Sequence, residues 1–209
     1  VGISFFTFQA MSYSIDVYRQ RIEPERNFMR FALFVAFFPQ LVAGPIEKAH
    51  NLLTQLRNSM RDAQPLQAFA AIEQITFGLF KKVAIADHIG PLIAPVFSHP
   101  EHYGSSDIAL VAVLFSVQIY CDFSGYTDIA LGTSRLFGIQ LQKNFDFPYF
   151  AANISDFWRR WHISLSSWLK EYLYIPLGGS RQGVKRMYAA LLLTMLLGGL
   201  WHGPSWNFI

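Results

Sequence analysis

Residues 187–209 constrain the fold most, because this stretch contains no Asp, Glu, Lys or Arg. A helix beginning near Arg186 rises about 22 Å before it reaches His202, most of the ~30 Å hydrocarbon core of a bilayer. We therefore predict a transmembrane helix with His202 at membrane depth. An ionisable side chain there marks a functional site when it faces the protein interior or a water-filled cavity. The alternative is a histidine that satisfies backbone groups freed at the Gly-Pro helix end.

The composition indicates a membrane protein. Hydrophobic residues make up 52% of the chain and charged residues 15%, against ~25% charged in soluble domains. The net charge of +3 comes from Lys and Arg scattered at the edges of apolar runs. This placement suits lipid headgroups and forms no basic stripe for a nucleic acid. The single Cys121 has no disulfide partner within the chain and is expected to be a small packing residue.

Several apolar runs predict an all-α fold, a polytopic transmembrane helix bundle with broken or re-entrant helices. Residues 1–15 read as the tail of one span, and 31–46 as a run interrupted by Pro39. Residues 66–86 have a helical period but carry Glu73, Lys81 and Lys82, which favours an amphipathic or partly buried helix. Both ends of the sequence lie inside apolar runs, so we expect 1–209 to be a single domain truncated at both ends. The membrane orientation of individual helices is left open, because arginines flank both sides of 31–46.

The clearest short span, 108–121, runs into a charged segment without an obvious turn. Asp122, Asp128 and Arg135 continue it. Buried charges need partners, so we predict that they pair with other charges, while lining a polar cavity is the alternative.

Residues 87–107 read as a connector with three prolines. Its histidines, His88, His99 and His102, have no metalloprotease-like spacing, and we predict solvated loop histidines, with metal binding by His99 and His102 as the alternative.

Residues 143–181 form the densest polar and aromatic stretch. Asn153, Ser155 and Asp156 are good N-cap types, so a helix is expected to begin at Ser155 or Asp156. On that helix Trp158 and His162 would share a face at i, i+4. A histidine walled by indoles beside arginines suits an anionic, extended substrate. The alternative is an interfacial helix anchored at the headgroups by Trp and Arg.

Three strings then carry a resemblance to a known family. The strings are QIYCDFSGYTDIALG at 118–132, NFDFPYFAANISDFWRRWHISLSSWLKEYLYIPLGGS at 144–180 and GGLWHGPSW at 198–206. They look like signature blocks of the membrane-bound O-acyltransferases. They most resemble the bacterial branch of alginate O-acetyltransferases and their relatives. The likeness extends from the first residues to the last.

The resemblance implies a membrane enzyme with a central funnel and tunnel, which moves an acyl group from a cytoplasmic donor to a hydroxyl across the bilayer. The family's catalytic histidine corresponds to His202, and a second to His162. Some family branches carry a different polar residue at the second position. The side chains expected to bind donor or acceptor surround these two histidines: Asn153, Asp156, Trp158, Arg159, Trp161 and Trp201.

The chemistry is consistent with this correspondence. A neutral imidazole within ~3 Å of a hydroxyl can accept its proton as the oxygen attacks a thioester. Burial disfavours the imidazolium and keeps His202 available as a base. A serine acyl-enzyme is the mechanistic rival, but neither Ser124 nor Ser205 has an evident acid–base partner. A transporter or flippase is the rival from another class.

The resemblance also implies the surroundings. Acetyl-CoA is the expected acyl donor, with no bound cofactor. The expected location is the bacterial inner membrane, as a multi-pass protein in contact with lipids. A periplasmic SGNH-type acyltransferase and a polysaccharide biosynthesis complex are the expected partners. Peptidoglycan acetylation and teichoic acid D-alanylation are alternative functions of related proteins.

Overall fold

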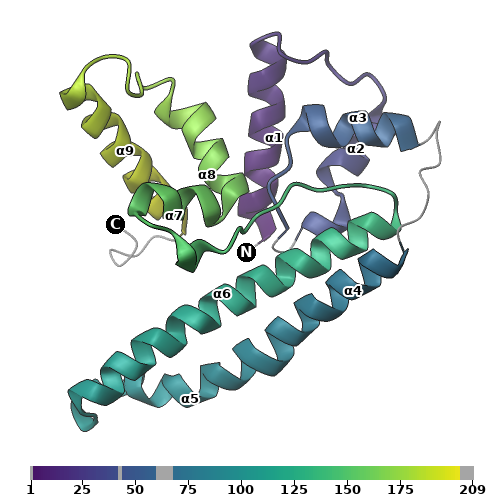
Figure 1. Cartoon of the computed structure of the whole chain (residues 1–209). Helices are drawn as coiled ribbons and strands as arrows, with labels where there is room; N and C mark the ends of the chain where they lie inside the picture. The colour runs from purple at the N-terminus through teal and green to yellow at the C-terminus, as the bar shows by residue number, and fades with distance from the viewer. Residues whose placement is uncertain (1, 42–43, 60–67, 203–209) are drawn as a thin grey trace. The chain divides into compact units, whose positions relative to one another are not determined.

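The computed structural model describes residues 2–41, 44–59 and 68–202, and all regular structure in these ranges is helical. The chain divides into two compact units (Figure 1). One comprises Val1–Pro24, Pro45–Ala49 and Lys143–Ile209, and the other Glu25–Gly44 and His50–Gln142. The prediction of one domain over 1–209 stays a prediction.

The second unit is built around one long helix. Helix α6, Ser105–Leu136, packs against α4, Ala68–Leu79, the π-helix η2, Phe80–Ala86, and α5, Asp87–Ser98 (Figure 1). The expected continuation of 108–121 into the charged segment is confirmed. Gly138 at φ 71° lies just beyond the helix end, where Ile139 N–H bonds the carbonyl of Ser134.

Small residues let α4 and α6 approach closely. A Cβ added to Gly125 would lie 2.8 Å from the carbonyl oxygen of Gly78, and one added to Gly132 would lie 2.7 Å from that of Ala71. Membrane helices associate through such backbone contacts, because apolar burial gives little driving force in lipid.

The prediction that 87–107 is a connector was wrong for its first half. Residues 87–98 form α5 despite Pro91 and Pro95 inside it. Each proline removes one amide donor, but Ile93 and Val96 are buried against Val111 of α6. This packing holds the helix that the prolines disfavour. The connector is limited to the short 3-10 turn η3, Pro100–His102, and its flanks.

The remaining helices of this unit are short. Helix α2, Phe28–Val35, is capped by Asn27, whose side chain accepts a hydrogen bond from the Arg30 N–H. The run then breaks at residues 36–37 and resumes as the 3-10 turn η1, Phe38–Gln40, which contains Pro39. The predicted interruption of this run is confirmed, and it falls just before the proline. Helix α3 is Ala49–Ser59.

The first unit contains α1, Gly2–Tyr18, and the C-terminal helices. After the turn η4, Pro148–Phe150, come α7, Ile154–Arg160, α8, Ile163–Leu169, the π-helix η5, Lys170–Tyr174, and α9, Val184–His202. Its core consists of buried side chains from α8, η5 and the segment before α3, with neighbours from α1 and α9: Ile46, Leu165, Trp168, Tyr172, Phe8, Ile15, Leu169 and Trp201.

Two described helices are long and apolar enough to cross a membrane. They are α6 and the part of α9 from Val184 to Trp201. Most of their residues are not buried within the described chain, so their apolar surfaces are available to lipid or to further helices.

Candidate functional site

The expected helix through 155–166 is interrupted, and that prediction was wrong in two respects. Helix α7 begins at Ile154 rather than at Ser155 or Asp156, with Asn153 as its N-cap. It ends at Arg160. His162 adopts the left-handed conformation, at φ 43°, as the residue preceding α8. His162 therefore does not share a helical face with Trp158.

Asn144 causes this interruption from outside the helices. Its backbone carbonyl accepts from the Ile163 N–H at 2.9 Å, and the Asp146 N–H donates to the Arg160 carbonyl at 2.9 Å. The segment 144–146 thus pairs with the ends of α7 and α8. A regular helix would need those same groups for its own hydrogen bonds.

His162 is buried in a polar cluster with Asn144 and Ser164. The three side chains are 4%, 1% and 1% exposed. His162 Nδ1 lies 3.1 Å from Asn144 Oδ1, which also receives the Ser164 backbone N–H at 3.2 Å and the Ser164 hydroxyl at 2.9 Å. The burial of a histidine among hydrogen-bonding groups is typical of catalytic sites and of satisfied core positions alike. Asn144 was not predicted as part of the site, because no sequence periodicity links it to His162, 18 positions later.

Aromatic rings from α7 and from the segment before it pack on one another. The Trp161 ring lies nearly parallel to that of Phe157, at 5.6 Å and 14°, and meets the edge of Phe145 at 5.1 Å and 81°. Tyr149 lies 6.1 Å from Trp161. Offset and edge-on pairs of this kind hold aromatic side chains in defined positions. The predicted site residue Trp161 is therefore fixed by packing.

Asn153 and Asp156 organise the start of α7. Asn153 Oδ1 accepts from the Asp156 N–H at 2.8 Å. The Asp156 carboxylate accepts from Arg160 Nε at 3.0 Å and from the Ala152 N–H at 3.3 Å. Arg160 lowers the pKa of Asp156 through this bond. Both predicted binding side chains thus have local partners.

Trp158 and Arg159 project from α7. Trp158 is 42% exposed, and Arg159 is exposed with its Nε donating to the Ser155 carbonyl at 3.3 Å. The planar guanidinium keeps further donors for a phosphate or carboxylate. Both of these predicted binding residues are therefore accessible in the described structure.

Trp201 and His202 end α9. Trp201 packs against Phe8 of α1, with ring centroids 5.1 Å apart, and Phe8 in turn contacts Trp168 at 4.3 Å. The backbone of His202 closes the helix, as expected from the sequence. Its side chain, and Ser205 with the rest of 203–209, lie outside the described residues.

A charged cluster joins α1 to η5 within the same unit. Tyr172 donates a 2.6 Å hydrogen bond to Asp16, and Glu171 pairs with Lys48 and Arg21. Burial opposes ionisation of Glu171, but the Lys48 ammonium and Arg21 outweigh it and lower the pKa of that carboxyl. Burial and the Asp16 carboxylate raise the pKa of the Tyr172 phenol.

Two acids of α6 have the charged partners expected from the sequence. Asp128 accepts from Lys81 at 2.6 Å and from Gln74 at 3.2 Å. Asp122 accepts from Lys82 at 2.6 Å. The prediction of charge pairing is confirmed for these two acids. Both lysines lie in the π-helix η2. A π-helical turn inserted in an α-helix changes the direction in which the following side chains point.

Ser124 has none of the features of a nucleophile in the described part of the chain. It is 2% exposed, and its Oγ has no hydrogen-bond partner there. A serine acyl-enzyme requires a base within hydrogen-bond reach. The described residues therefore offer Ser124 no such base.

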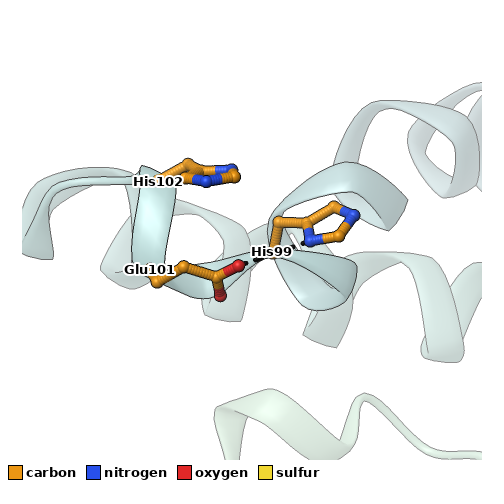
Figure 2. Close-up of side chains that lie close together, drawn as sticks. All are labelled: His99, Glu101 and His102. Carbon is orange, nitrogen blue, oxygen red and sulfur yellow. Dashed lines mark hydrogen bonds and ion pairs between the residues drawn. The ribbon is translucent and has the colours of Figure 1, made fainter.

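His99, Glu101 and His102 gather at the turn between α5 and α6 (Figure 2). His99 Nδ1 lies 3.3 Å from Glu101 Oε1, and the two imidazoles lie 5.6 Å apart. Their donor atoms fall within 4.8 Å of one another, close enough to bind a divalent cation after small rotations. All three side chains are exposed. By contrast, the ligands of structural metal sites are held in place by further hydrogen bonds from surrounding groups. His88 was wrongly assigned to a loop and lies in the first turn of α5.

Known proteins resemble the chain along its whole length. A family model described as MBOAT, membrane-bound O-acyltransferase family, matches residues 3–209. The whole chain is 45% identical to a probable alginate O-acetylase, AlgI, of Azotobacter vinelandii, and covers 41% of that protein. It is 39% identical to a peptidoglycan O-acetyltransferase of Helicobacter pylori, covering 44% of it, and 28% identical to a teichoic acid D-alanyltransferase of Bacillus subtilis, covering 55%.

The chain thus spans about two fifths of the length of the alginate O-acetylases it matches. The match is continuous and includes the aromatic and polar blocks around His162 and His202. It also leaves no described helix outside the matched range. The chain belongs to the membrane-bound O-acyltransferase family.

Proposed function

We propose that the full-length protein transfers an acetyl group from acetyl-CoA to hydroxyls of an alginate-type exopolysaccharide. The observation that carries this proposal is the order of identities among the relatives. Identity is 45% to an alginate O-acetylase, 39% to a peptidoglycan O-acetyltransferase and 28% to a teichoic acid D-alanyltransferase. Acetyl is therefore favoured over D-alanyl, and a polysaccharide hydroxyl is the favoured acceptor.

His202 acts as the general base in this proposal. The neutral imidazole takes the proton of the acceptor hydroxyl as its oxygen attacks the thioester carbonyl. The C–S bond then breaks, and the thiolate leaves and is protonated as free CoA. A position at the end of the apolar helix α9 favours the uncharged imidazole that this step needs.

His162 is the second catalytic residue. Its burial with Asn144 and Ser164 supports a fixed imidazole beside the reaction. Trp158 and Arg159 bind the donor or acceptor at the accessible end, with the guanidinium on phosphate or carboxylate groups. Trp161 and Trp201 form apolar walls, while Asn153 and Asp156 contribute by shaping the start of α7.

The proposal places this chemistry in a polytopic helix bundle around a central tunnel, in the bacterial inner membrane and in contact with its lipids. The two long apolar helices support the membrane setting. Acetyl-CoA reaches the tunnel from the cytoplasm. A periplasmic SGNH-type acyltransferase, within a polysaccharide biosynthesis complex, receives the acetyl group or completes its transfer.

Peptidoglycan is the second candidate acceptor, favoured by the 39% identity to the Helicobacter pylori enzyme. Peptidoglycan and alginate acetylation share the donor and the base. They differ only in the sugar that receives the acetyl group, so product analysis separates them.

The test uses membrane vesicles that contain the full-length protein and acetyl-CoA labelled in the acetyl group. Wild type is compared with His202→Ala, His162→Ala and the matched control His88→Ala, an exposed histidine of α5. We expect label to reach a polysaccharide or partner protein in wild type and control only. Normal transfer in both active-site variants would show that the histidines are misassigned. Wild type that moves no label would favour another donor or a transporter.

A further inference from the structure

The Asn144 amide has only one orientation that fits its surroundings. The backbone N–H of Ser164 lies 3.2 Å from Oδ1 and can only donate. Rotating the amide by 180° would direct its NH₂ group at this N–H, which would bring two donors together. The oxygen therefore faces the start of α8, and the backbone N–H of Ser164 fixes the orientation of the amide.

This orientation determines the protonation of His162. Asn144 Oδ1 can only accept, and His162 Nδ1 lies 3.1 Å from it, so Nδ1 must carry the hydrogen. In a neutral imidazole the other nitrogen, Nε2, then holds the lone pair. We infer that Asn144 is a positioning residue that holds His162 in the Nδ1-protonated tautomer and so makes Nε2 the basic atom of the site.

The backbone reinforces this arrangement. His162 lies at φ 43°, a conformation that costs a non-glycine residue free energy and persists where the surroundings impose it. The hydrogen bonds from Ile163 N–H to the Asn144 carbonyl and from Asp146 N–H to the Arg160 carbonyl impose it here. The same residue thus fixes both the backbone and the tautomer of His162.

The nitrogen of the Asn144 amide can be replaced without removing the acceptor of the cluster. Asn144 is 1% exposed, and its Nδ2 has no acceptor among the described residues. Only the oxygen of this side chain therefore serves the cluster. Asn144→Asp keeps an oxygen acceptor at that position, whereas Asn144→Ala removes it. Ser164→Ala is the matched control: it deletes the hydroxyl that donates to Oδ1 and lies 3.5 Å from His162 Nδ1, and it keeps the 3.1 Å bond between His162 Nδ1 and Oδ1.

The inference rests on the proposed function for its catalytic meaning, and the first readout does not depend on that function. Full-length protein labelled with ¹⁵N-histidine is reconstituted in bilayers and studied by solid-state NMR. The His162 signals are identified by their loss in His162→Asn, since asparagine tolerates the left-handed conformation. Wild type, Asn144→Asp and Ser164→Ala should show a protonated Nδ1 and an unprotonated Nε2. Asn144→Ala should show the other tautomer or a mixture.

The second readout is acyl transfer in vesicles. Asn144→Ala should lose activity roughly 10²-fold, while Asn144→Asp and Ser164→Ala keep most of it. A wild-type His162 protonated at Nε2 would overturn the inference, even if Asn144→Ala fails to fold. An unchanged tautomer in a folded Asn144→Ala would overturn it as well. Absent transfer by wild type would instead count against the proposed function and leave the tautomer measurement decisive for Asn144.

Discussion

The hydroxyl of Tyr172 donates a 2.6 Å hydrogen bond to the carboxylate of Asp16, joining η5 to α1 across 156 residues of sequence. Both side chains are buried, at 7% and 4% exposure. Tyr172 also belongs to the apolar core of its unit, next to Trp168. This bond therefore couples the core beneath α8 to the N-terminal helix.

Tyr172→Phe should destabilise the protein by ~1–3 kcal/mol, because the buried Asp16 carboxylate loses its short bond and is left with the longer contact to Arg21 at 3.5 Å. The measurement is the thermal unfolding midpoint of the full-length protein in detergent. Tyr18→Phe is the matched control, since Tyr18 lies on the same helix α1 at 89% exposure. Equal midpoints for the two variants would show that the bond contributes nothing.

Local patterns predicted several elements of the fold. The absence of charge in 187–202 predicted α9, the proline in 31–46 predicted the break before η1, and the missing turn after 121 predicted one long α6. Each of these rests on hydrophobicity or backbone chemistry within a few residues. The pairing of Asp122 and Asp128 with other charges was also predicted, because both acids continue an apolar span.

What the sequence did not predict depends on contacts between distant residues. The α7–α8 break is imposed by Asn144, which satisfies the amides that a continuous helix would use. Helix α5 forms through packing of Ile93 against α6, although its prolines predict a loop. For the candidate site, the sequence identified His162 but placed it on a helical face. Its burial and its Asn144 partner needed the structure.

Acid should weaken the unit that contains Glu25. The Glu25 side chain is 4% exposed and accepts from Arg57 Nε at 2.9 Å. Burial raises its pKa, but the Asn27 amide and Arg57 with Arg30 outweigh this and hold the pKa below the ordinary 4.5. A lowered pKa gives stability that is present above 4.5 and lost as the pH falls through the folded-state value.

Glu25→Gln should therefore reduce the loss of stability between about pH 5 and pH 3. The measurement is the unfolding midpoint across this range for wild type and variant. Glu23→Gln, at an exposed position two residues earlier, serves as the control. If both variants follow the wild-type acid slope, Glu25 is not the group that titrates.

Gly125 should tolerate no side chain. A Cβ there would lie 2.8 Å from the Gly78 carbonyl oxygen and 3.2 Å from the Lys82 backbone nitrogen, so α4 and α6 would have to separate. We expect Gly125→Ala to cost ~1–3 kcal/mol, the range for overpacked sites. Gly104→Ala is the control, because its nearest contact is an ordinary 3.5 Å from Asp107. Detergent unfolding midpoints should fall for the first variant only, and a similar fall for both would point to a general cost of alanine.

Lys81 and Asp128 should matter more as a pair than as individual charges. They lie 2.6 Å apart with side chains 12% and 20% exposed, and Gln74 donates to the same carboxylate. Removing one partner leaves an uncompensated charge, so Lys81→Met or Asp128→Asn alone should cost ~1–3 kcal/mol.

The double variant removes both charges and leaves an amide beside Gln74, so its stability should return to within about 1 kcal/mol of wild type. A double-mutant cycle on unfolding free energies in detergent measures this coupling. Additive losses in the double variant would mean that each charge interacts chiefly with groups other than its partner.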